Sequence, residues 1–328
     1  MIPIPPEICE LPGQTDGMFR YIIRRLLQMV LAFFGTTLIV YAMVFAGQGS
    51  PREVAQSLAG ERPITDAQVN ALIREYHLDQ GFFGQYWNYI SNLLTGDPGR
   101  SLTGREISEI LASAWPVTAR LALIAILFTI LFGVTAGVIA GIRRGGVFDT
   151  TTLVLTLVVI GIPAIVLAPL AQYLFGINWR IFPATFNPRN PLYSLILPGL
   201  VLGSLSVATA LRLTRASVAE NLRADYVRTA RSKGLSQKRI VGAHVLRNSL
   251  IPIVTFLGVE LGNLMGGAIV TEGVFNVPGV GFNLARGIRT DDGPLVVGLV
   301  SVLVVVYLVV NLVVDLLYAV LDPRIRYD

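Results

Sequence analysis

The chain has 328 residues, of which 53% are hydrophobic and only 14% are charged. This composition, with a mean hydropathy of +0.63, excludes an ordinary water-soluble domain and is typical of an integral membrane protein. The formal net charge of +5 is compatible with nucleic-acid binding, but Lys and Arg also collect beside membrane spans on the cytoplasmic side. The positions of the cations along the chain must decide between these two explanations. The single cysteine, Cys9, cannot form an internal disulfide, and two histidines without a ligand cluster predict no metal site.

The sequence opens with residues 1–17, a stretch with four prolines that we expect to be a disordered tail. Residues 18–46 follow and contain the first of six apolar runs that can each cross roughly 30 Å of hydrocarbon as a helix. This first run is too long for the apolar core of a signal peptide, so we interpret it as an uncleaved anchor. The six predicted spans are Leu26–Ala46, Leu121–Ile142, Thr151–Leu174, Leu192–Leu211, Leu250–Val270 and Leu295–Val320.

Residues 47–116 separate the first two spans, and we expect them to fold as a helical extracytoplasmic segment. Thr65 with Gln68, and Thr103 with Glu106, fit the capping box of a helix start, which predicts two short helices. Between them, the stretch FFGQYWNYISNLL is dense in aromatic residues. This composition is typical of a segment at the lipid headgroups, and a surface that admits substrate or docks a receptor is the alternative.

Residues 117–328 contain the other five spans and form the predicted core. Pro163 lies inside the third span, where it removes a backbone donor and favours a kink. A bent helix beside a transport pathway and a purely architectural kink both remain open. In the fifth span, glycines four residues apart share one face, which predicts close helix packing at Gly258, Gly262 and Gly266.

Two carboxylates within the predicted spans require compensation. Glu260 lies near the middle of the fifth span, where a charge costs about 2.5 to 3.5 kcal/mol unless it is neutralised or solvated. It either lines a wet pathway or is protonated at a helix contact, and both interpretations stay open. Asp315 shares one face of the sixth span with Tyr318 and Asp322, which favours a structural hydrogen bond or ion pair near the cytoplasmic end.

The most cationic stretch is residues 212–250, which follow the fourth span. Alanine and apolar residues recur there at helical spacing up to Gly234, which we expect to end a helix, and Ser236 begins a second helix that returns toward the membrane. This arrangement predicts a docking element rather than a merely solvated loop. The second helix is predicted to place on one side Ile240, Val241, His244 and Val245.

The orientation follows from cations in the short loops, because Lys and Arg collect on the cytoplasmic side. Arg143 and Arg144 follow the second span, the basic stretch follows the fourth, and Arg324 and Arg326 follow the sixth. With an even number of spans, both termini are then predicted to be cytoplasmic. Nucleic-acid binding has no support as the reason for the basic stretch, because no recognition fold accompanies it.

The stretch DYVRTARSKGLSQKRIVGAHVLRNSLIP, residues 225–252, resembles the cytoplasmic loop of permease subunits in ATP-driven importers of the ABC class. The resemblance includes GGAIVTEGVFNVPGVG and YAVLDPRIRYD and covers nearly all of the chain from Met18. General importer permeases carry an EAA signature in this loop, followed by a glycine, and only Ala230 and Gly234 match it here. The stretch RTAR, residues 228–231, resembles the variant of this signature in the dipeptide, oligopeptide and nickel permeases. The resemblance implies a B-type subunit with an all-α, type I importer permease architecture of six transmembrane helices.

In that family the loop is a coupling helix that inserts into a separate ATPase subunit. The resemblance therefore implies no catalytic residue and no cofactor in this chain, with ATP and Mg²⁺ held by two ATPase subunits; the sequence contains no G-x-x-x-x-G-K-[ST] loop. It also implies a heterodimer with a homologous second permease, an extracytoplasmic substrate-binding protein, and a multi-pass place in the bacterial inner membrane. The loop positions concerned are Asp225, Arg228, Thr229, Ala230, Lys233, Gly234, Leu235 and His244, with Ala230, Gly234 and Leu235 at the expected contact.

Peptides are the expected cargo, and nickel chelates, haem and glutathione are alternatives within the same branch. A secondary transporter is an alternative of another class, but it would carry coupling carboxylates deep in several spans, and Glu260 alone qualifies. A channel would need a filter-like loop or rings of charge, which are not legible. A membrane enzyme has no legible site, because His77 and His244 fall on opposite sides of the predicted membrane.

Overall fold

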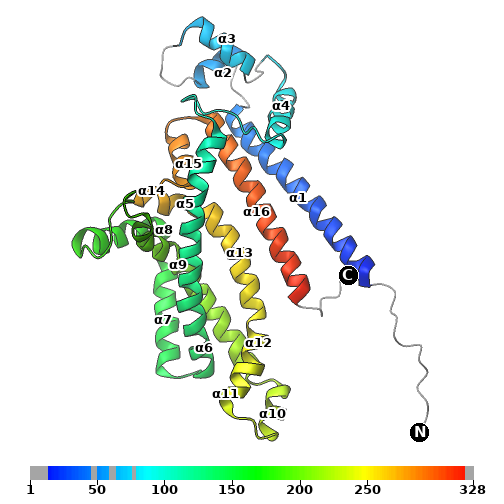
Figure 1. Ribbon diagram of the computed structural model, residues 1–328, viewed down its shortest axis with the longest axis vertical. Coiled ribbons are helices and arrows are strands. Elements are labelled where there is room, and N and C mark those ends of the chain that lie inside the picture. Colours follow the sequence, from blue (N-terminus) through cyan, green and yellow to red (C-terminus); the bar gives the residue numbers. More distant parts are fainter. Residues whose placement is uncertain (1–13, 46–49, 59–63, 76–78, 322–328) are drawn as a thin grey trace.

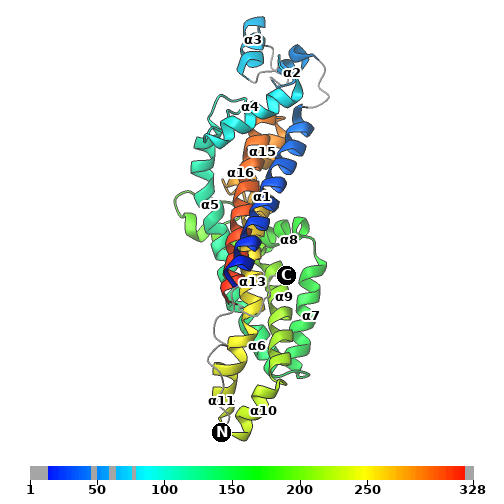
Figure 2. The ribbon, with the colours of Figure 1, turned by 90° about the vertical axis from the view of Figure 1, so that its right-hand side faces the viewer.

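The computed structural model describes residues 14–45, 50–58, 64–75 and 79–321. These residues are mostly helical, with turns and irregular loops between the helices and one isolated bridge between Arg100 and Glu106. The molecule is elongated, with α2 and α3 at one end of its long axis and α10 and α11 at the other (Figure 1, Figure 2). Of the predicted tail, residues 14–17 form the first turn of α1, and residues 1–13 lie outside the described part.

The helical elements follow one another along the chain as α1 Gln14–Phe45, α2 Pro51–Leu58, α3 Asp66–Glu75, α4 Phe82–Leu94, α5 Ile107–Phe128, η1 Thr129–Val134, α6 Thr135–Ile142, α7 Val147–Gly161, α8 Ala164–Ala171, η2 Gln172–Asn178, α9 Pro191–Asn221, α10 Asp225–Ser232, α11 Gln237–Arg239, η3 Ile240–Val245, α12 Leu246–Ser249, α13 Ile251–Gly267, α14 Ile269–Phe275, α15 Val280–Arg289 and α16 Gly293–Leu321. The three η elements are π-helical segments.

Six helical passes correspond to the six predicted spans. Four are continuous and apolar within the described residues: α1, the run of α5 through α6, α9 and α16. Two more are pairs of helices joined at a bend, α7 with α8–η2, and the run of α11 through α12 with α13. With each bent pair counted as one pass, the chain is an all-α membrane protein of six spans.

The third span is a sharp break rather than the mild kink that its proline favours. α7 ends at Gly161, α8 begins at Ala164, and the two axes differ by 101°. The ring of Pro163 pushes the preceding residue out of the helical region, and Ile162 is extended with φ −96° and ψ 116°. Pro163 itself has φ −58° and ψ 142°. Two consecutive extended residues end the helix, and α8 therefore runs across the bundle (Figure 1).

The second span begins earlier than its hydropathy predicts. α5 begins at Ile107, so residues 107–116 belong to a continuous 36-residue helix rather than to the external segment. The first turns of α5 are amphipathic: Ile107 and Ile110 are buried, whereas Ser108 and Glu109 are exposed. This polar face lowers the mean hydropathy, so a search for apolar runs places the boundary too late.

Close contact between α9 and the α5–α6 run depends on glycines. A Cβ atom on Gly137 would lie 2.6 Å from the Thr214 Cβ and 2.7 Å from the Leu211 carbonyl oxygen. Gly141 similarly faces Val218, at 2.8 Å from a built Cβ. On the α9 side, Gly203 faces the backbone of α5. Small residues at the contact let the two backbones approach, which is the main source of helix association in a bilayer.

The sixth pass packs between α1 and α13. Gly258 and Gly262 of α13 face Val314 and Val310 of α16, whereas the surroundings of Gly266 lie outside the described side chains. Arg25 of α1 forms an ion pair with Asp315 of α16, with 3.2 Å between Nη1 and Oδ2. The Tyr318 side chain and all of Asp322, which were predicted on the same face as Asp315, also lie outside the described part.

A buried carboxylate joins α5, α14 and α15. Glu272 is fully buried; its Oε1 accepts a hydrogen bond from the Thr118 hydroxyl at 2.7 Å, and its Oε2 accepts one from the Phe282 amide at 2.9 Å. A Cβ atom on Gly279 would lie 2.3 Å from this carboxyl group, so the position has room for glycine alone. The carboxylate thus caps the first turn of α15 and fixes it to α5.

The α9 contact predicts a position-specific effect of adding one methyl group. Gly137→Ala should lower the thermal midpoint of the purified protein by about 2 to 8 °C, because overpacking costs roughly 1 to 3 kcal/mol. Gly35→Ala in α1 is the matched control, since a Cβ there meets no atom within 4 Å. Equal midpoints for the two variants, measured by scanning fluorimetry in the same detergent, would contradict the close contact.

Candidate functional site

The basic stretch folds as a helical hairpin that continues two membrane helices. α9 ends at Asn221, and α10 begins at Asp225 after a turn over residues 222–224. The returning arm consists of α11, η3 and α12, and it leads into α13 with a bend of 46°. The hairpin is therefore connected through short breaks to α9 on one side and to α13 on the other, at the end of the molecule opposite to α2 and α3 (Figure 1).

The base of this hairpin is fixed by hydrogen bonds and an apolar cluster. The Ser217 hydroxyl donates to the Ser249 carbonyl at 3.1 Å, and the Ser249 hydroxyl donates to the Ser217 carbonyl at 3.4 Å. These reciprocal bonds join α9 to α12. An apolar cluster inside the hairpin consists of Val218, Val227, Ala230, Ile240 and Val245, and all five are buried.

The turn at the tip has the geometry of a glycine-capped helix end. Gly234 has φ +76°, a conformation that side-chain-bearing residues rarely adopt. Its amide donates to the Arg231 carbonyl at 2.9 Å, and the Leu235 amide donates to the Ala230 carbonyl at 3.2 Å. A Cβ on Gly234 would meet no atom within 4 Å, so the backbone conformation, rather than space, requires glycine here.

The exposed surface of the hairpin is polar and cationic. Arg228, Thr229 and Lys233 are exposed, and Arg228 Nη1 lies 3.5 Å from Oδ1 of Asp225, which is also exposed. Ala230, by contrast, is only 7% exposed and packs within the apolar cluster of the hairpin. The Ala230 methyl group thus holds α10 against the returning arm. Of the other two residues predicted at the contact, Gly234 is exposed and Leu235 is half-buried against the same cluster.

The returning arm differs from the prediction at His244. Ile240 and Val245 are buried, but His244 is exposed and does not share their side. The reason is that Ile240–Val245 is π-helical, so each hydrogen bond spans five residues instead of four. The periodicity of an α-helix therefore does not describe this arm, and the predicted grouping of His244 with Ile240 and Val245 is wrong.

Glu260 lies at the contact between α13 and α9. Its Oε1 accepts a short hydrogen bond from the Ser206 hydroxyl, and its Oε2 accepts one from the side-chain Nδ2 of Asn263 at 3.3 Å. Ser206 is buried, whereas Glu260 is half-exposed. One carboxylate oxygen thus joins two helices while the side chain remains accessible from one side. Pro163, the other predicted pathway residue, lies at the break between α7 and α8.

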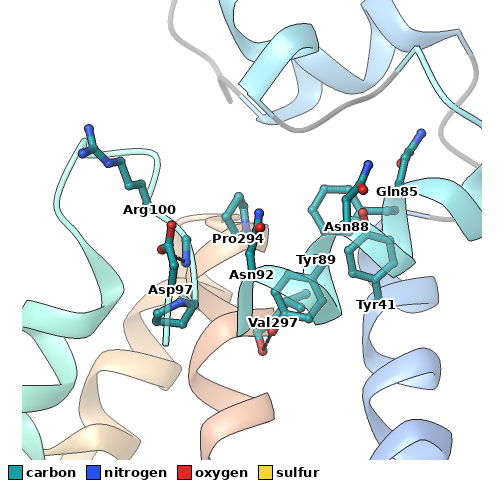
Figure 3. A pocket seen from close by; sticks show the side chains of 12 residues that line it. Tyr41, Gln85, Asn88, Tyr89, Asn92, Asp97, Arg100, Pro294 and Val297 are labelled. Atoms are coloured by element: carbon teal, nitrogen blue, oxygen red, sulfur yellow. Dashed lines mark hydrogen bonds between the residues drawn. The ribbon is translucent and has the colours of Figure 1, made fainter. Parts of the chain in front are cut away.

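At the opposite end, a pocket of about 150 Å³ lies between α1, α4, the loop over residues 97–100 and the start of α16. Figure 3 shows its aromatic floor of Tyr41 and Tyr89, with Asn88 and Arg100 pointing away from it. The two tyrosine rings have centroids 5.4 Å apart. The pocket thus combines an aromatic floor with a polar rim at the end of the molecule that carries α2 and α3.

The described residues of the predicted extracytoplasmic segment form three helices ahead of α5 rather than two: α2, α3 and α4. The capping box of α3 is confirmed: the Thr65 amide donates to the Gln68 side chain at 2.9 Å, and the Gln68 amide donates to the Thr65 hydroxyl at 3.4 Å. The box predicted at Thr103 is wrong, because Glu106 is the N-cap residue and its carboxylate pairs with Arg100 at 3.0 Å.

The aromatic stretch of α4 divides between two faces. Tyr86 is buried and donates a hydrogen bond to the Phe34 carbonyl of α1 at 3.0 Å, and Tyr89 bonds the Ser301 hydroxyl of α16 at 2.8 Å. Phe83 and Trp87 are 75% and 64% exposed on the other face. The inner face fixes the segment to the spans, and the outer face offers the aromatic surface expected at a membrane interface.

Two features of this architecture escape the sequence-based analysis. The buried ion pair between Asp149 of α7 and Arg215 of α9 joins residues 66 positions apart, and no local pattern indicates it. Arg120 lies on an exposed face of α5 within the continuous apolar helix. A charge at such a position requires water or a partner. If the start of the span at Ile107 is known, a search for cations inside the span finds Arg120.

Curated relatives match almost the entire chain. It is 34% identical over 340 residues to the dipeptide transport system permease protein DppB of Escherichia coli K12, with 94% of this chain and 99% of the relative covered. It is 37% identical over 338 residues to the di/tripeptide transport system permease protein DppB of Pseudomonas aeruginosa, with 94% and 99% covered. The glutathione transport system permease protein GsiC of Escherichia coli K12 is 37% identical over 312 residues, with 94% and 100% covered.

Two family models match consecutive parts of the chain. Residues 18–122 match the N-terminal part of the membrane component of binding-protein-dependent transport systems. Residues 133–327 match the inner membrane component of the same systems, a range that includes the hairpin, Glu260 and the α13–α16 contact. The protein is therefore a membrane permease subunit and not an enzyme, and it belongs to the family of binding-protein-dependent transport system inner membrane components, the permeases of ABC importers.

Proposed function

We propose that this chain is one of two permease subunits in an ATP-driven importer of small peptides and forms half of the translocation pathway. The observation that carries the proposal is the hairpin, which extends α9 and α13 beyond the bundle and exposes a cationic tip. A projecting element tied directly to two membrane helices suits a part that receives force from a soluble partner.

In this proposal, α10 docks into a groove on an ATPase subunit. The exposed side chains around Arg228 and Lys233 meet the partner, Gly234 provides the tight turn, and the buried cluster around Ala230 keeps the hairpin rigid. When two ATPases close around ATP and Mg²⁺, the hairpin moves as one body. The reciprocal Ser217–Ser249 bonds then pass that displacement to α9 and α13 together.

The proposed complex contains this chain, a homologous second permease as a heterodimer, two ATPases and an extracytoplasmic binding protein. ATP and Mg²⁺ bind to the ATPases, and this chain holds no cofactor. The hairpin and both termini lie in the cytoplasm of a bacterial cell, and the protein lies in the inner membrane. The outer pocket of Figure 3, together with the exposed aromatic residues of α4, lies at the end that would meet the binding protein.

Peptides are the proposed cargo because relatives at 34% and 37% identity are named for dipeptide and di/tripeptide transport. Glutathione is the second candidate, since an equally similar relative is named for its transport. Dipeptides and glutathione are both short peptides with charged ends, so a pathway with the same polar lining suits either. Uptake of labelled dipeptides and glutathione by proteoliposomes with the whole complex tests the assignment, and uptake by this chain without ATPases and ATP would refute it.

The tip geometry predicts a specific loss of coupling. Gly234→Val should leave membrane insertion intact but reduce co-purification of the ATPase subunits, because a β-branched residue at positive φ costs about 1 to 2 kcal/mol and distorts the turn. Gly242→Val is the control: this glycine is also exposed, lacks positive φ and meets no atom within 4 Å of a built Cβ. Full coupling of ATP hydrolysis to uptake in the Gly234 variant would contradict the assignment.

A pathway role of Glu260 predicts altered transport without loss of folding. Glu260→Gln retains an oxygen acceptor for the Ser206 hydroxyl but removes the negative charge, so uptake and its pH dependence should change while thermal stability stays close to wild type. Glu109→Gln, on the exposed outer turn of α5, is the matched control. If the Glu260 variant imports every tested peptide normally across a broad pH range, Glu260 has only the structural role.

A further inference from the structure

A second cavity lies at the hairpin end of the membrane helices. It has a volume of about 320 Å³ and opens where the turn between α6 and α7 meets α9. Three arginines and one carboxylate line it, together with two alanines: Arg144, Arg215, Ala216, Ala219, Glu220 and Arg223. The α9 residues follow one another at helical spacing along one face, and Arg144 closes the cavity from the turn.

Asp149 fixes the position of one of these arginines, Arg215, before any ligand binds. Arg215 Nη2 donates to Asp149 Oδ2 at 2.8 Å, and its Nε makes a short bond to the other carboxylate oxygen. The Gly145 amide donates to the same Asp149 Oδ2 at 2.8 Å, which ties the α6–α7 turn to the pair. A guanidinium group has five N–H donors, and the buried carboxylate takes two of those on Arg215. The group can therefore bind a further oxyanion without reorganising.

The charge in the cavity favours an anionic ligand. Asp149 compensates Arg215, and the remaining side chains are two exposed arginines, Arg144 and Arg223, with one exposed carboxylate, Glu220. Planar guanidinium groups match the oxygens of a phosphate, and three of them around one cavity form a typical phosphate site. Glu220 suits a ligand that also carries a hydroxyl donor.

The surface next to the cavity is apolar. Val147 and Phe148, directly before Asp149 in α7, are 85% and 40% exposed. The exposed apolar face continues along α7 through Val154, Leu155 and Val158. Because α7 belongs to a membrane span, this face contacts acyl chains, and the headgroup of a phospholipid beside α7 would lie next to the basic cavity. The combination of a basic cavity and an apolar stripe at the membrane surface thus selects a lipid.

We propose that this cavity binds the phosphate headgroup of an anionic phospholipid, phosphatidylglycerol, from the leaflet on the hairpin side. Arg144, Arg215 and Arg223 bind the phosphate oxygens, Glu220 accepts a hydrogen bond from a glycerol hydroxyl, and the acyl chains lie along α7. The bound lipid connects the α6–α7 turn to the cytoplasmic end of α9 and so stabilises the helix that carries the hairpin. This inference does not depend on the transported substrate.

The test uses the full-length chain purified in detergent, with phosphatidylglycerol, phosphatidylcholine or sn-glycerol 3-phosphate added. Native mass spectrometry should show retained phosphatidylglycerol, and this lipid alone should raise the thermal midpoint. The double variant Arg144→Gln with Arg223→Gln should weaken phosphatidylglycerol retention about thirtyfold, since each arginine near a bilayer surface contributes roughly a factor of five. Arg189→Gln, an exposed arginine at another site, should retain wild-type binding.

A second variant leaves every charge in place. Ala216 is exposed, so Ala216→Phe should fold and fill the cavity, with the same loss of lipid binding. Equal stabilisation by sn-glycerol 3-phosphate would overturn the lipid in favour of a soluble phosphate. Unchanged lipid retention in both cavity variants would also overturn the lipid proposal. If these variants, expressed together with the ATPase subunits and purified in phosphatidylcholine, instead failed to retain those subunits, the cavity would be a protein contact.

Discussion

The structure depends on the close contact between α9 and the α5–α6 run. Gly133, Gly137 and Gly141 form a stripe on the α5–α6 run, and each faces α9 so closely that an added Cβ would lie within 3.0 Å of it. In a bilayer there is no hydrophobic driving force between helices, so this intimate packing supplies much of the association energy. It also removes the free space in which α9 could slide alone, and α9 and α5–α6 must move as one unit.

That unit reaches from the end of the molecule near α4 to the hairpin (Figure 1). In α5, the Thr118 hydroxyl binds Glu272, and in α9, Ser217 forms the reciprocal bonds with Ser249 of α12. The same helices therefore connect the capped end of α15 with the base of the hairpin. Coupling over such a distance needs contiguous rigid contacts, and this chain of buried polar bonds and glycine contacts supplies them.

The sequence predicted what is periodic or local. Apolar runs gave the six passes, Gly234 gave the turn, and Thr65 with Gln68 gave the start of α3. The sequence did not predict features that depend on contacts between residues far apart in the chain or on small changes in backbone geometry. The inward position of Ala230 and the Asp149–Arg215 pair result from packing against partners that no local pattern specifies. The start of α5 at Ile107 was missed for another reason, because its amphipathic first turns lower the mean hydropathy there.

The π-helical turn at Ile240–Val245 holds, in effect, one residue more than an α-helix needs over the same rise. Deletion of one exposed residue there, such as Gly242, would let the arm close into a regular helix. Everything after it, from α12 into α13, would then keep its orientation relative to α10, because the π-helical turn holds the extra residue locally. Ser249 would stay beside Ser217 and Glu260 beside Ser206, whereas removal of one residue from α12 would rotate α13 by about 100° and break the contact between Glu260 and Ser206.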